Sequence, residues 1–378
     1  MRAFVFTDKA LERYAGRFVW LSIDTEKAKN AKFLTKFPIS VWPTLLVVDP
    51  KSEGVALRYV GGATVNQLTK LLDDGARVVA AKAPVSADTL LGNADRLAAQ
   101  NKNDEAAKLY ELALSKAPSN WPSSGRAAES YLFSLSMSHD NERCANEAKR
   151  LYPKYRGTSS AANVASTGLS CAMDLDAKNA SRKDLIATLE KSTREVFDDP
   201  KLELSGDDRS GLYESLISAR HEANDLLGEQ QLKENWVAFL ESEASKAKTA
   251  EQRAVYDPHR LGAYLDLGLP EKAIPMLQQS ERDFPDDYNP PARLALAYKE
   301  MGNYDEALAA SDRALKKAYG PRKLGILRTR ADIYTAKGDK AAARKTLSDA
   351  ITYAKALPAA QQSSRQLAAL EKKLADLK

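Results

Sequence analysis

The chain has 378 residues, of which 44% are hydrophobic and 28% charged, and its formal net charge is +5. Acidic and basic residues are interspersed without the basic stripe of a nucleic-acid binder, and no apolar run approaches the ~20 residues of a membrane-spanning helix. The two cysteines and three histidines follow no metal-site spacing, and no Gly-rich phosphate loop occurs. We therefore expect no cofactor, no metal, no catalytic residue, no nucleic acid and no membrane span, and a length suited to more than one domain.

The first 76 residues predict a small α/β domain. The apolar run at 44–48 (TLLVV) has the length and β-branching of a buried strand, and a turn cluster at 49–54 separates it from a second strand. The predicted elements in chain order are the body of a helix at 1–6, a strand at 18–23, a helix at 25–37, strands at 44–48 and 55–60, and a helix at 64–72.

This order resembles the thioredoxin family, in which an Ile-x-x-x-Pro-Thr stretch with a cis proline enters a core strand. Here the stretch runs from Ile39 to Pro43 and Thr44. The resemblance implies a cis Trp42–Pro43 bond, and it implies that Val41, Trp42, Pro43 and Thr44 dock a substrate peptide as an added strand. The alternative is an ordinary trans proline at a strand start.

The family's first strand and its Cys-x-x-Cys have no counterpart in residues 1–76. We therefore expect the native frame to continue upstream of Met1 and to encode both. The longer chain would be a protein-disulfide oxidoreductase acting on disulfide-bearing client proteins, whereas the chain as given is redox-inactive. An upstream secretory signal would place it in the periplasm, and its absence would place it in the cytoplasm.

From residue 86 the apolar pattern becomes helical and repeats. Ala273 and Ala307 are 34 residues apart, and Ala343 follows 36 residues later. With Gly, aromatic and Pro residues at matching offsets, these positions resemble the tetratricopeptide repeat, a pair of antiparallel helices. The predicted parts are a linker at 77–85, an α-solenoid at 86–358 with its clearest repeats at 87–118, 254–287, 288–321 and 324–357, and a capping helix at 359–378. Residues 119–257 keep apolar stripes without the register, which indicates diverged hairpins. The last helix has an alternative role as a free amphipathic helix that seeks a partner.

Two sets of residues in the helical region are candidates for a special role. Cys144 and Cys171 lie on apolar stripes, either as a disulfide between adjacent antiparallel helices or as two buried thiols. The repeat offsets place Arg293, Lys299 and Arg328 near the concave face, where they would clamp an acidic or C-terminal carboxylate partner. The alternative is that these three are solvated surface charges.

Taken together, the sequence predicts an α/β thioredoxin-like N-terminal domain followed by an all-α solenoid of tetratricopeptide type. The predicted function is a thiol–disulfide protein with a protein-interaction region, and the partner is a protein or peptide on the concave face. The alternative function is a non-catalytic scaffold that binds a partner peptide.

Overall fold

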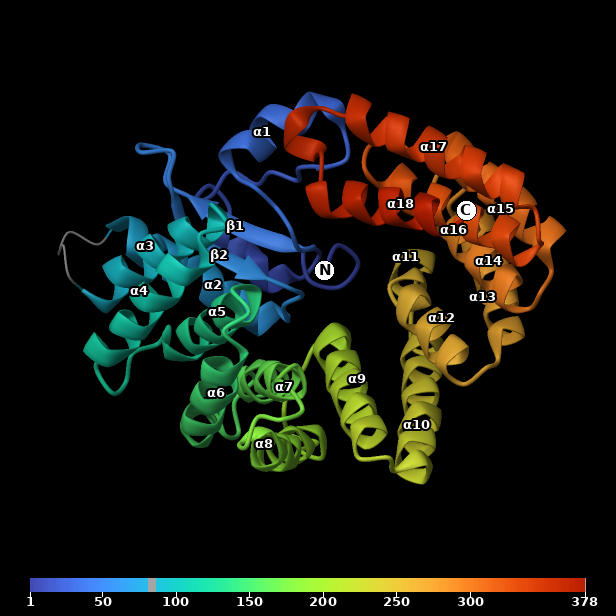
Figure 1. Ribbon diagram of the computed structural model, residues 1–378. Coiled ribbons are helices and arrows are strands. Elements are labelled where there is room, and N and C mark those ends of the chain that lie inside the picture. Colours follow the sequence, from blue (N-terminus) through green and yellow to red (C-terminus); the bar gives the residue numbers. More distant parts are fainter. Residues whose placement is uncertain (81–85, 378) are drawn as a thin grey trace. The chain divides into compact units, whose positions relative to one another are not determined.

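The computed structural model describes residues 1–80 and 86–377, and most of them are helical (Figure 1). Contacts between Cα atoms divide the chain into two compact units. Unit 1 comprises Met1–Phe18 and Ile39–Lys233, and unit 2 comprises Val19–Pro38 and Glu234–Lys378. None of the helices in the described ranges combines the length and apolar character needed to cross a bilayer.

The sheet of unit 1 has two antiparallel strands, β1 (Thr44–Val48) and β2 (Val55–Val60). Thr44 pairs with Val60, and the register shifts between Val47 and Val48. Helix α2 (Val65–Ala80) packs closely on β1, because a Cβ atom added at Gly75 would lie 2.7 Å from a methyl carbon of Val47. Glycine is therefore required on the face of α2 that meets the strand.

The predicted thioredoxin-like domain is not supported, since the described residues form only this two-stranded sheet. Residues 1–6 form turns and are followed by the 3-10 helix η1 (Lys9–Tyr14). Residues 18–23 are not a strand, and Val19 and Leu21 are 88% and 75% exposed. A strand is stable only when a neighbour pairs with it. Residues 19–23 of this run group with unit 2, whereas β1 and β2 belong to unit 1.

Three helical hairpins follow in unit 1: α3–α4, α5–α6 and α7–α8. The bounds are α3 (Ala87–Ala99), α4 (Asn103–Lys116), α5 (Ser124–Met137), α6 (Asn141–Tyr155), α7 (Ser160–Met173), α8 (Arg182–Phe197) and α9 (Gly206–Glu222). Helix α10 (Leu226–Ser245) begins in unit 1 and continues in unit 2. Helix α5 contacts α7, and α7 contacts α9, so alternate helices line up along the stack. Helices α5 to α8 thus keep a hairpin arrangement although they lie in the part of the chain that loses the repeat register.

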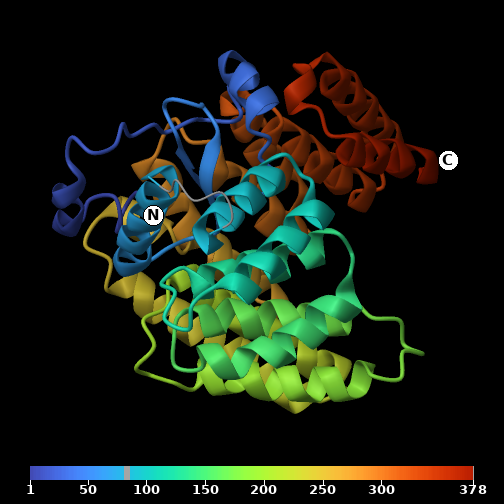
Figure 2. The same cartoon turned by 90° about the vertical axis from the view of Figure 1, so that its left-hand side faces the viewer.

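Unit 2 contains three further hairpins, α12–α13, α14–α15 and α16–α17, and the last helix packs on α17 (Figure 1, Figure 2). The bounds are η2 (Ala28–Asn30), α1 (Ala31–Lys36), α11 (Ala250–Ala254), α12 (Asp257–Asp266), η3 (Pro270–Lys272), α13 (Ala273–Asp283), α14 (Asn289–Glu300), α15 (Tyr304–Lys317), α16 (Arg322–Ala336), α17 (Lys340–Ala356), η4 (Ala359–Gln361) and α18 (Ser364–Asp376). Gly268, Gly302 and Gly338 end the first helices with φ values of 71°, 77° and 84°. This left-handed conformation is the one that glycine adopts without strain.

The predicted linker at 77–85 lies partly in a helix and partly outside the described residues. Helix α2 extends to Ala80, so residues 77–80 are helical, and residues 81–85 are not described. The helix predicted at 25–37 is divided into η2 and α1. In the predicted capping segment, η4 precedes α18, and residue 378 lies outside the described part.

Candidate peptide-binding surface

The first helices of the three hairpins in unit 2 lie along one line. Helix α12 contacts α14, and α14 contacts α16. In a curved stack of hairpins the helices nearest the axis of curvature approach one another most closely, and they line the extended binding surface. We call the exposed side of α12, α14 and α16 the first-helix face.

The three basic residues predicted for this surface do not converge into one clamp. Arg293 is half-buried on α14, and burial lowers its pKa although the nearby Asp257 and Asp287 raise it. Lys299 pairs with its neighbour Glu300. Arg293 and Lys299 are six positions apart on one helix, so their side chains leave the helix axis in directions about 120° apart. Their joint role in binding stays a prediction.

Arg328 is the exposed member of the predicted set and lies on α16. Its side chain is exposed, so the guanidinium is accessible to solvent. A guanidinium binds a carboxylate through two parallel hydrogen bonds, which gives both charge and geometry. Its role in binding stays a prediction.

A short acidic segment, residues 24–26, lies against the hairpins of unit 2. The Glu26 carboxylate accepts a hydrogen bond of 2.8 Å from the backbone N–H of Arg322, at the start of α16. The Tyr319 hydroxyl donates to Asp24 over 2.6 Å, and the Gln361 amide donates to the carbonyl of Thr25 over 2.8 Å. The sequence carried no signal of this association, because the partners are separated by 295 to 336 residues.

The contacts of the acidic segment change the pKa of Glu26 within it and the pKa of Tyr319, which it touches. Burial raises the pKa of Glu26, whose side chain is 11% exposed, and hydrogen bonding and charge from Arg322 act in the opposite direction. The hydrogen bond to Asp24 raises the pKa of Tyr319 to about 12. Both groups are thus engaged in a specific contact and are not merely adjacent at the surface.

The stretch around Pro43 forms the entrance to β1. The Trp42–Pro43 bond is cis, as the resemblance implied. The Thr44 hydroxyl donates to the carbonyl of Val41 over 2.7 Å, and the N–H of Gly61 donates to the carbonyl of Pro43 over 2.9 Å. The predicted peptide-docking role of Val41, Trp42, Pro43 and Thr44 is not tested by this geometry.

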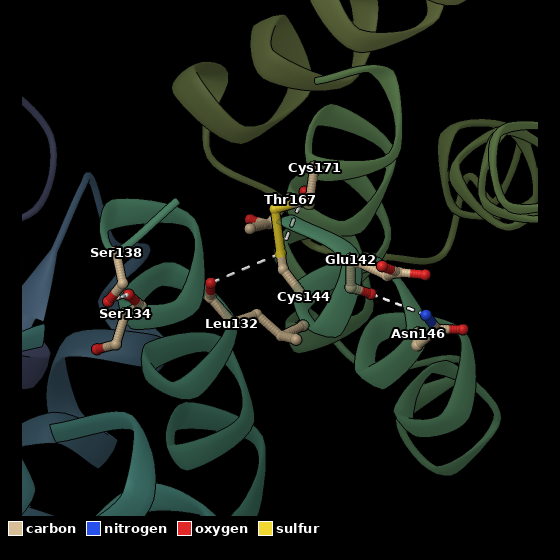
Figure 3. Close-up of a disulfide and its surroundings, with 8 residues drawn as sticks. All are labelled: Leu132, Ser134, Ser138, Glu142, Cys144, Asn146, Thr167 and Cys171. Carbon is tan, nitrogen blue, oxygen red and sulfur yellow. Dashed lines mark hydrogen bonds between the residues drawn. A yellow bond between two sulfur atoms is a disulfide. The ribbon is translucent and has the colours of Figure 1, made fainter. Parts of the chain in front are cut away.

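The two cysteines form a disulfide between α6 and α7 (Figure 3). The Cα atoms of Cys144 and Cys171 are 6.1 Å apart, and both residues are buried. The Cys144 sulfur lies 3.8 Å from the carbonyl oxygen of Leu132 on α5. The chain has no other cysteine, so a thiol–disulfide role has no reactive pair among its residues.

The sequence also did not predict a buried ionic cluster in unit 1. Arg126 on α5 donates to Asp95 on α3 over 2.7 Å, and its Nε lies 3.8 Å from a carboxylate oxygen of Asp74 on α2. Tyr110 on α4 donates to Asp95 over 2.6 Å. Burial raises the pKa of Asp95, and the charge of Arg126 counteracts this effect. These residues join four helices, and we therefore interpret the cluster as one that stabilises helix packing.

Among the described residues there is no group of three or more His, Cys, Asp or Glu side chains that could hold a metal ion.

Comparison with known proteins gives a family match and matches to solved structures. A family model for the tetratricopeptide repeat matches residues 292–316, which covers most of α14 and the larger part of α15. No curated protein matches the chain. The chain is similar to a solved structure of the TPR2AB domain–pHSP90 complex of yeast Sti1, with 16% identity and a TM-score of 0.29. That match covers 76% of this chain and 98% of the other. Residues 292–316 therefore form a tetratricopeptide repeat.

Proposed function

We propose that the chain is a tetratricopeptide-type scaffold that binds a partner protein or peptide on the first-helix face of unit 2. The observation that supports this proposal is the position of the repeat. The family match at 292–316 falls on the middle one of three consecutive hairpins, whose first helices contact one another in succession. Stacked hairpins of this kind provide an extended surface for an extended ligand.

The proposed ligand is an acidic peptide or a free C-terminal carboxylate. The support for this choice is Arg328, which is exposed on one of the helices of the face. A thiol–disulfide role has less support, because both cysteines are buried in one disulfide. We also propose an oxidising compartment, in which such a disulfide persists.

The test is selection of peptides with a free carboxylate from a random displayed library, followed by fluorescence anisotropy of a selected peptide with the full chain. Because a hydrogen bond to a charged group contributes about 1.5–3 kcal/mol, Arg328→Ala should weaken binding about 10- to 100-fold. Arg344→Ala is the matched control, since Arg344 is exposed on α17, a second helix of the hairpins. Equal loss in both variants, or no enriched peptide, would contradict the proposal.

A further inference from the structure

Residues 24–26 contact the hairpins of unit 2 as a short turn, in which the N–H of Glu26 donates to the Asp24 side chain over 3.0 Å. Three consecutive residues make hydrogen bonds to three separate places: the loop between α15 and α16, the start of α16, and η4. Two of these bonds use acidic side chains, and the third uses the backbone carbonyl of the residue between them. A single Asp or Glu that happened to meet a surface lysine would not produce this pattern.

Gly320 shapes the surface under the segment. Its φ of +59° lies in the left-handed region, and a Cβ atom added there would be 2.1 Å from the carbonyl oxygen of Glu26. Any side chain at this position would displace the segment. The loop between α15 and α16 is therefore complementary in shape to the backbone of this turn.

The start of α16 supplies the electrostatic part of the surface. The first N–H groups of a helix have no partner within the helix, and the helix dipole favours an anion there. The preceding residue, Pro321, makes no side-chain capping bond to α16. Instead the Glu26 carboxylate receives the N–H of Arg322, whose guanidinium Nε lies 3.5 Å from the second carboxylate oxygen.

The burial of the Gln361 side chain is a further observation that indicates a binding site here. The side chain is 6% exposed, and its amide nitrogen donates to the carbonyl of Thr25. Its amide oxygen is buried without a hydrogen-bond partner in the described part of the chain. Burying an unpaired acceptor is unfavourable. The buried Gln361 side chain nevertheless directs its amide N–H donor toward a backbone carbonyl.

We propose that Tyr319, Gly320, the N–H of Arg322 and Gln361 form a second peptide site, here called the rim site, and that residues 24–26 occupy it as a ligand built into the chain. The rim site binds an acidic-x-acidic turn of a partner protein, for which the acidic segment is the competitor. It consists of helix ends and loops and is distinct from the first-helix face. Binding of a partner is weakened by the fraction of chains in which the site is already filled.

The test uses the full chain and a fluorescein-labelled peptide with the sequence of residues 20–30, WLSIDTEKAKN. The variant Asp24→Asn with Glu26→Gln removes both charges from the built-in segment. We expect the peptide to bind this double variant at least 10-fold more tightly than the wild type in fluorescence anisotropy. Hydrogen exchange should accelerate at residues 19–38 in the same variant, because the segment is released.

Two matched controls distinguish the rim site from general charge attraction. A peptide with the two acids replaced, WLSINTQKAKN, should bind the double variant at least 10-fold more weakly than the acidic peptide. Adding Gly320→Ala to the double variant should abolish binding, whereas Gly325→Ala should not, since a Cβ atom at Gly325 meets nothing within 4 Å. Circular dichroism checks that both glycine variants fold.

Two kinds of outcome would overturn the proposal. Equal affinity of the wild type and the double variant would show that residues 24–26 do not occupy the binding site. Failure of the acidic peptide to bind either protein, or equal binding of the acidic and neutral peptides to the double variant, would show that the rim site does not recognise such peptides. Neither outcome bears on the first-helix face, which is tested separately by Arg328→Ala.

Discussion

Units 1 and 2 both stack helical hairpins, but different interactions hold them together. In unit 2 small buried residues recur in the repeat register, among them Ala295, Ala307, Ala331 and Ala343. In unit 1 the register is lost after the first hairpin, and a disulfide and a buried ionic cluster centred on Arg126 join the helices. The core of unit 1 also contains many buried alanines, so the disulfide and the ionic cluster add specific cross-links to close packing where the repeat diverges.

The largest effect should come from removing the charge at the centre of the unit 1 cluster. Arg126 is 5% exposed, and its loss leaves the buried carboxylate of Asp95 without its cation, whereas Asp74 still pairs with Arg77. Breaking such a buried pair costs about 3–5 kcal/mol, so Arg126→Leu should destabilise unit 1 by that amount. Urea unfolding of the full chain, with hydrogen exchange at α5 and α14 to separate the units, measures the loss.

The matched control for Arg126 is Arg313→Leu in unit 2. Arg313 pairs with Glu281 over 2.8 Å at the protein surface. Exposed pairs contribute about 0–1 kcal/mol. A similar loss in both variants would contradict the view that buried charge holds unit 1 in particular.

The disulfide should have the next largest effect, again confined to unit 1. It closes a loop with a sequence separation of 27 residues, and bridges of this kind stabilise proteins by about 2–4 kcal/mol. The double variant Cys144→Ala and Cys171→Ala should therefore lower the free energy of unfolding of unit 1, with hydrogen exchange at α14 unchanged. Titration of the unreduced, folded wild type should find no free thiol. Two titratable thiols would show that Cys144 and Cys171 do not form a disulfide.

Overpacking should affect unit 2 by a smaller amount. Ala307 is 0% exposed within the core formed by α12 to α15. A larger side chain forces its neighbours away, at a cost of about 1–3 kcal/mol, so Ala307→Leu should destabilise unit 2 and leave exchange in unit 1 unchanged. Ala309→Leu on the exposed side of the same helix is the control and should change stability little. Equal effects would show that close packing at the repeat position is not what stabilises the unit.

The smallest effect concerns pH. Burial raises the pKa of Glu129 in unit 1, while hydrogen bonds from Ser160 and Asn163 lower it. A carboxyl whose pKa is higher in the folded than in the unfolded state costs stability as pH rises from its unfolded pKa through its folded pKa. Glu129→Gln should therefore gain stability relative to the wild type at pH 7 compared with pH 4. Glu105→Gln, at an exposed position on α4, is the control. A difference between Glu129→Gln and the wild type that is independent of pH would contradict the prediction.

The sequence by itself determined the local structure. The β-branched run at 44–48 and its turn predicted β1 and the hairpin to β2, because alternation and turn chemistry act over a few residues. Helical periodicity and the alanine spacing of 34 and 36 residues predicted the hairpins around α14 and α16, since small residues are needed wherever two helices cross closely. These signals depend on neighbours in the chain, so one sequence is enough to detect them.

Only the tertiary structure decided which distant surfaces meet. Residues 18–23 have the composition of a strand, but no neighbouring strand pairs with them. Arg126 and Asp95 are 31 positions apart in the sequence, and Glu26 and Arg322 are 296 apart. The periodicity of a helix or strand extends over a few residues, so it cannot predict such partners. The physical reason is that helical spacing fixes which side of a helix is apolar, whereas the pairing of charges depends on how the finished elements pack against one another.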